Sequence, residues 1–163
     1  MYKRQFHSYD DLEFGSYSNI YPCNWLQVYD NIPDQMHTSQ LHSPNMRVIS
    51  DDDDGSYHST AFHPVFAQLP VMEYASVRND TAMVFSAGRR VGKDKVWVRL
   101  NDVILPNLTL HPHTAEAGAE ARYFHRVYMA RWYVPIDNEN SIVFGIRMFG
   151  EQVDPYHTGD KSR

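Results

Sequence analysis

The chain has 163 residues, of which 42% are hydrophobic and 13% aromatic, a composition typical of a globular protein and not of a disordered one. Its formal net charge of −5 and the lack of a basic stripe exclude a nucleic-acid-binding surface, and no run of about 18 apolar residues offers a membrane span. A single cysteine excludes an internal disulfide, so we expect one cytoplasmic domain over residues 1–163.

The N-terminal part of the chain predicts one helix between two irregular segments. Residues 1–20 are polar and aromatic without a clear period, so we expect an irregular lead-in or a strand that lacks its partner. Residues 24–42 carry a helix pattern, with Asn24 suited to cap its start and Pro33 expected to break or kink it. Residues 43–70, with three prolines and four consecutive aspartates, predict a long loop.

From residue 71 onward the hydrophobic period changes to two, which predicts β-strands. The strand-like runs are rich in β-branched and aromatic residues, and Gly, Asn, Asp and Pro separate them. They cover residues 74–78, 82–86, 95–100, 123–134 and 141–149. A helix, a long loop and five or six successive strands predict an α+β fold with an antiparallel sheet over residues 71–150.

Within the predicted helix, two histidines and an aspartate have the residue types of a non-haem iron site. His37 and His42 are five residues apart, and Asp34 precedes His37 by three. Two histidines and a carboxylate can bind iron(II) on one face and leave positions open for oxygen. Asp34 and His37 are neighbours on a helix surface, so Asp34 can accept a hydrogen bond from the His37 ring and fix its tautomer.

The spacing of the two histidines sets a geometric condition. Five residues on a regular helix rotate the second side chain by about 140° from the first, too far for both rings to reach one metal. We therefore predict a widened turn or a helix end between His37 and His42, with Pro44 marking a stop just beyond. In a chain with nine histidines, the alternative is an accidental pair.

The wider pattern resembles the active-site helix of the Rieske-type non-haem iron oxygenases, the family of the catalytic α subunits of aromatic ring-hydroxylating oxygenases. The run Cys-Asn-Trp-Leu-Gln at 23–27 precedes Asp30, Asp34, His37 and His42, which is similar to the family pattern N-W-x-Q-x-x-E-x-x-x-D-x-x-H-x-x-x-x-H. The aspartate at position 30 replaces the usual glutamate.

A second match and one departure accompany the helix motif. Residues 134–141 resemble the family turn P-[VI]-D-D-x-x-[ST] ahead of a late strand, and residues 101–107 correspond to a central strand. Pro33 is unexpected in the family helix. The resemblance covers roughly residues 20–150.

The resemblance implies a helix-grip or START-like fold, an antiparallel sheet curled around the helix, here incomplete. It implies that His37 and His42 bind a mononuclear Fe(II). It makes Asp34 the bridge through which electrons reach His37 from the cluster of a neighbouring subunit. Asn24 is either an active-site residue of this family or only the helix cap.

Two parts of the family's machinery are not found in the sequence. The [2Fe–2S] cluster of full-length members takes two cysteines and two histidines, which a chain with Cys23 alone cannot supply. The third iron ligand of the family is an aspartate on a late helix, for which Asp154 and Asp160 are the candidates here. We therefore expect part of a catalytic domain, without the cluster domain and the last helix.

Two functions follow as hypotheses. The first is the catalytic-domain portion of an oxidoreductase that hydroxylates or demethylates an aromatic or other hydrophobic molecule with O2. A reductase or ferredoxin would supply electrons, and the full-length family implies a homotrimer. The second is a non-catalytic helix-grip module that binds an apolar ligand. We expect the isolated chain to bind iron(II) or zinc(II) weakly and to be inactive, because the third ligand and the cluster are absent.

Overall fold

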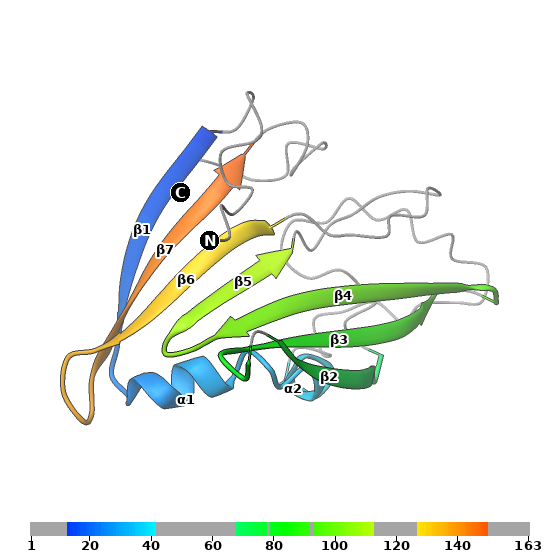
Figure 1. The fold of residues 1–163 in the computed structure, drawn as a ribbon, viewed down its shortest axis with the longest axis horizontal. Helices are drawn as coiled ribbons and strands as arrows, with labels where there is room; N and C mark the ends of the chain where they lie inside the picture. Colours follow the sequence, from blue (N-terminus) through cyan, green and yellow to red (C-terminus); the bar gives the residue numbers. More distant parts are fainter. Residues whose placement is uncertain (1–12, 42–67, 78, 92, 113–126, 150–163) are drawn as a thin grey trace.

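The computed structural model describes residues 13–41, 68–77, 79–91, 93–112 and 127–149. In these residues, seven strands form one antiparallel sheet, and two short helices lie together against one of its faces (Figure 1). The strand directions turn steadily across the sheet, so that the sheet curls around the helical segment. This confirms the predicted α+β, helix-grip class of fold.

The elements follow one another in a simple order. They are β1 (Glu13–Tyr21), α1 (Trp25–Asp30), α2 (Met36–Leu41), β2 (Val71–Val77), β3 (Ala82–Val91), β4 (Lys95–Ile104), β5 (Leu108–Pro112), β6 (Val127–Pro135) and β7 (Ser141–Phe149). The order in the sheet is β1-β7-β6-β5-β4-β3-β2, so β2 to β7 form a meander and β1 joins its far edge. Neither described helix is long and apolar enough to cross a membrane.

For residues 1–20 the sequence predicts an irregular lead-in or a strand without its partner, whereas the described residues of this segment form a strand that does have a partner. Strand β1 pairs with β7 along its whole length, from Glu13 opposite Phe149 to Tyr21 opposite Ser141. Because β1 is an edge strand with no fully buried residue, its sequence shows no clear alternation. Its partner comes from the other end of the described chain, which local pattern cannot reveal.

Strand β5 is the other element that the sequence pattern missed. It has only five residues, and the last four are all buried, so the alternation that marks a half-exposed strand is absent. The remaining predicted strands coincide with β2, β3, β4, β6 and β7. Of the predicted loop 43–70, only the last residues lie within the described part of the chain.

The single helix predicted for residues 24–42 is two short helices. Asn24 caps α1, because its Oδ1 accepts a hydrogen bond from the backbone N–H of Leu26 (2.9 Å). Pro33 lies between the end of α1 and the start of α2, which confirms the predicted break. Helices of six residues are not stable alone, so packing against the sheet must hold both.

The apolar core lies between α1 and the sheet. The ring of Tyr29 on α1 meets the ring of Tyr133 on β6 edge-on, with centroids 5.4 Å apart. The Tyr29 hydroxyl donates a hydrogen bond to the backbone oxygen of Ile104 (3.2 Å), and burial raises the pKa of this hydroxyl to about 12. Three buried side chains complete the cluster, Phe85, Val103 and Val143.

Gly145 on β7 leaves room for the ring of Tyr17, its neighbour on β1. A Cβ atom at position 145 would lie 2.2 Å from Cζ of Tyr17. The ring cannot move aside cheaply, because Nε of Arg131 donates to its hydroxyl (2.7 Å) and the Arg147 guanidinium lies over it at 5.2 Å.

The variant Gly145→Ala should therefore lower the free energy of unfolding by about 1–3 kcal/mol, the usual cost of overpacking. Gly88→Ala is the matched control, since a Cβ there meets its nearest atom at 3.7 Å and should leave stability unchanged or improve it by up to about 1 kcal/mol. Denaturant titration measures both. Equal stability of the two variants would show that Tyr17 is not held over Gly145.

Candidate functional site

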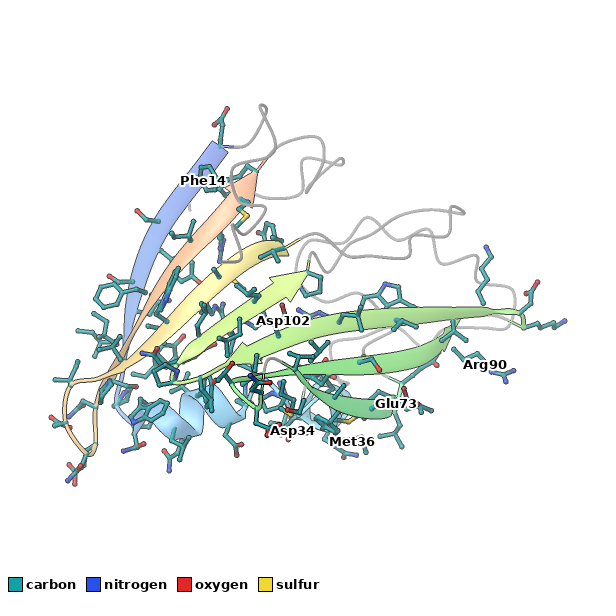
Figure 2. The ribbon with its side chains drawn as sticks, viewed as in Figure 1. Phe14, Asp34, Met36, Glu73, Arg90 and Asp102 are labelled. Carbon is teal, nitrogen blue, oxygen red and sulfur yellow. The ribbon has the colours of Figure 1, made fainter. Side chains whose placement is uncertain are left out.

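Helix α2 carries His37, and the carboxylate of Asp34 caps its start. Oδ1 of Asp34 accepts hydrogen bonds from the backbone N–H groups of Met36 (3.0 Å) and His37 (3.3 Å). These bonds satisfy two of the amide donors that a helix start leaves open. Figure 2 shows Asp34 and Met36 on the helical side of the sheet, by β2 and β3.

The ring of His37 contacts Asp34 through the backbone and not through the carboxylate. Nδ1 of His37 lies against the Asp34 carbonyl oxygen. A carbonyl oxygen only accepts, so Nδ1 is the donor in this contact. Metal-binding histidines commonly have this arrangement, with the second ring nitrogen bonded to a carbonyl or carboxylate. The Asp34–His37 contact predicted from the i, i+3 spacing is present, but the carboxylate caps the helix instead.

The remaining predicted ligands cannot be placed. His42, Asp154 and Asp160 lie outside the described residues, so the turn geometry expected between His37 and His42 stays a prediction. Among the residues that the structure does describe, no three His, Cys, Asp or Glu side chains gather as a metal site. Of the predicted ligands, the described residues contain only His37, which is half-buried on the turn that Asp34 caps.

Asn24 connects the two motifs on which the family resemblance depends. While its Oδ1 caps α1, its Nδ2 donates to the backbone oxygen of Asn138 in the β6–β7 turn (3.2 Å). In that turn, Oδ1 of Asp137 accepts hydrogen bonds from the backbone N–H groups of Glu139 and Asn140, with N···O distances of 2.7 Å in both. These bonds, together with the Asn140 side-chain amide, hold the pKa of Asp137 below its usual value. Of the two roles expected for Asn24, the structure describes the cap.

The sheet face that the helices cover carries a row of polar side chains, which the sequence pattern did not single out. Strand register places them on the same face as the core residues Phe85 and Tyr133. They are Arg89, Arg99, Asn101, His111 and Arg131. The signal in the sequence is weak but present: positions 97, 99, 101 and 103 of β4 share one face, and two of them are polar.

Asn101 is the buried polar side chain whose hydrogen-bonding capacity is least used. It is 1% exposed, and neither its Oδ1 nor its Nδ2 has a partner among the described residues. A buried polar group left without a hydrogen bond costs about 1–3 kcal/mol. The amide therefore retains both a donor and an acceptor that no described residue uses.

The charges on this face make it electropositive around a neutral histidine. Burial, together with the smaller effect of the nearby charges of Arg89 and Arg131, lowers the pKa of Arg99 to about 10. Burial, followed by the charges of Arg99 and Arg131, lowers the pKa of His111 well below its usual value. Nε2 of His111 is hydrogen-bonded to the hydroxyl of Thr109 (2.8 Å).

Two curated proteins are similar to this chain in sequence. It is 38% identical over 143 residues to the tert-butanol monooxygenase / tert-amyl alcohol desaturase oxygenase subunit of Aquincola tertiaricarbonis. It is 24% identical over 119 residues to phenoxybenzoate dioxygenase subunit alpha of Ectopseudomonas oleovorans. The chain belongs to the Rieske-type oxygenases. No protein-family model matches it.

The chain corresponds to part of the oxygenase catalytic domain. The two alignments cover 88% and 73% of this chain but only 30% and 24% of the relatives. The solved structure of dicamba monooxygenase with 3,6-dichlorosalicylic acid has the same fold, with a TM-score of 0.55 at 12% identity. That match covers 93% of this chain and 44% of the other, so the described sheet and helices have the fold of the matched part of that protein.

The neutral, buried His111 should make stability depend on pH. The unfolded chain binds a proton at this histidine below about pH 6.5, whereas the folded state does not until a much lower pH. The free energy of unfolding should then fall as pH is lowered through this window, by up to about 1.4 kcal/mol per pH unit. Denaturant titrations of the protein and of His111→Asn measure the difference. The same slope in both would contradict a buried neutral His111.

Proposed function

We propose that this chain forms the iron-binding and substrate-facing part of an oxygenase that uses O2 to hydroxylate or demethylate a hydrophobic small molecule. The observation that carries the proposal is the 38% identity with an oxygenase subunit across 88% of the chain. The contact of His37 Nδ1 with the Asp34 carbonyl supports it independently. Both relatives are named as oxygenases, so they do not favour the alternative, a binding module without turnover.

In this proposal His37 and His42 hold a mononuclear iron(II). When bound, the iron supplies the redox chemistry with O2. Asp34 fixes the start of α2 with its carboxylate and the His37 tautomer with its carbonyl oxygen. Asp34 is also exposed, as a residue that passes electrons from a neighbouring subunit to His37 has to be.

The substrate would lie on the face of the sheet that carries the polar row described above. The names of the relatives contain tert-butanol, tert-amyl alcohol and phenoxybenzoate, which all combine an apolar body with a polar oxygen group. A substrate of that form suits this face, because Asn101 offers an unused amide beside the aromatic ring of Phe85, its opposite residue on β3.

Several properties of the whole protein remain part of the proposal. They are a [2Fe–2S] cluster outside this chain, a reductase or ferredoxin partner, a homotrimer and a cytoplasmic location. Asp154 and Asp160 stay candidates for the third iron ligand. The chain spans about a third or less of its curated relatives, so these properties depend on segments beyond those aligned.

Metal titration of the full-length protein that carries this chain tests the iron site. The double variant His37→Ala, His42→Ala should bind iron(II) or cobalt(II) more than about 100-fold more weakly, because the loss of outer-shell partners alone costs about 10–100-fold. Competition with a chelator of known affinity gives the dissociation constants. His58→Ala, a histidine outside the motif, is the control and should bind metal as the parent does. Equal affinity of the double variant and the parent would refute the proposed ligands.

A further inference from the structure

A single buried guanidinium attaches α2 to the sheet. Arg89 on β3 is 1% exposed. Its Nη2 donates to the backbone oxygen of Gln35 (3.1 Å) and to Oγ1 of Thr38 (2.9 Å). Its Nε donates to the backbone oxygen of Gln68 (3.0 Å), just ahead of β2. One side chain thus joins β3, the approach to β2 and the first turn of α2.

The two acceptors, one just before α2 and one in its first turn, lie on either side of His37 in the sequence. Gln35 and Thr38 are 4% and 8% exposed and face the sheet, whereas His37 is only half-buried. Oγ1 of Thr38 also donates to the Gln35 carbonyl (2.7 Å), so the two acceptors form one compact unit. With the Asp34 cap at the outer end, the turn that carries His37 is held from two sides.

A buried arginine at this position is costly unless its hydrogen bonds are specific. Burial lowers the pKa of Arg89 to about 10, which records the penalty of removing its charge from water. A well-packed apolar side chain is often at least as stabilising as a buried charge. An apolar side chain cannot supply several directed hydrogen-bond donors. Lysine can donate, but it lacks the rigid planar arrangement of donors that arginine has.

We propose that Arg89 is a positioning residue for the metal centre, which fixes the first turn of α2 so that the His37 ring keeps its orientation toward the metal. Arg89 does not touch the metal. It acts through the Gln35 carbonyl and the Thr38 hydroxyl. The inference rests on the proposed function, because it assumes that His37 is a ligand.

The test uses the full-length protein with cobalt(II) as a spectroscopic probe. Arg89→Met keeps much of the side-chain length but removes every donor, and Arg89→Lys keeps the charge without the fork. Arg90→Met is the matched control, because Arg90 is the next residue on β3 and is exposed (Figure 2). Cobalt(II) affinity and the ligand-field absorption spectrum at saturation are measured for each.

We expect Arg89→Met to bind cobalt(II) about 10–100-fold more weakly, the range for outer-shell partners of a metal ligand, and to show an altered spectrum at saturation. Arg89→Lys should lie between this variant and the parent, and Arg90→Met should match the parent. If Arg89→Met does not fold, the spectrum and affinity of Arg89→Lys decide. A parent-like spectrum at saturation in the folded Arg89 variants would overturn the proposal, since a purely structural role leaves the ligand geometry unchanged.

The outcome for Arg89 is separable from the outcome for the ligands. If the His37, His42 double variant binds metal as the parent does, the proposed function fails. If that double variant loses the metal while the Arg89 variants keep both affinity and spectrum, only the positioning role fails.

Discussion

The contact between Tyr29 and Tyr133 holds the helical segment on the sheet, and the geometry of the candidate site depends on it. A helix of six residues does not persist alone in water. The edge-on ring pair contributes about 0.5–1.5 kcal/mol beyond the apolar area it buries. The hydroxyl bond from Tyr29 to Ile104 then ties α1 to the end of β4. With α1 fixed, the turn at Pro33 places α2 beside β3. There Arg89 donates a hydrogen bond to the backbone oxygen of Gln35, just before α2.

The residues of the family motifs have structural roles in this chain. Asn24 and the β6–β7 turn are far apart in sequence, yet the Asn24 amide bonds the backbone oxygen of Asn138. Asp137 braces that turn with its carboxylate. Asp34 is likewise a helix cap before any role in electron transfer. Residues that resemble a catalytic pattern therefore also build the frame that presents it.

The polar row on the covered face of the sheet is not the arrangement expected if stability alone determined the side chains there. A buried face of arginines, an amide and a neutral histidine is less favourable than an apolar one, because each group must be compensated. Two nitrogens of Arg89, Nε and Nη2, donate hydrogen bonds, and His111 is hydrogen-bonded to Thr109. Asn101 is not compensated by any described residue. Functional sites are where such departures from the most stable packing are expected.

The features that depend on neighbouring residues could be predicted from the sequence. Pro33 breaks the helix because its ring excludes the preceding turn, Asn24 caps because its side chain reaches a nearby amide, and β7 has the predicted bounds because its residues alternate. The iron motif was also visible from the sequence, through its resemblance to a family.

Which distant residues meet could not be predicted in this way, because it depends on the whole fold. Strand β1 is a strand because β7 pairs with it, and β5 is buried by its neighbours on both sides, so neither shows a local pattern. Arg89 and Asn101 read as ordinary strand residues until strand register places them under the helices. The physical reason is that periodicity encodes which side of an element is buried, whereas hydrogen bonds across the fold depend on which surface the other elements bring to that side.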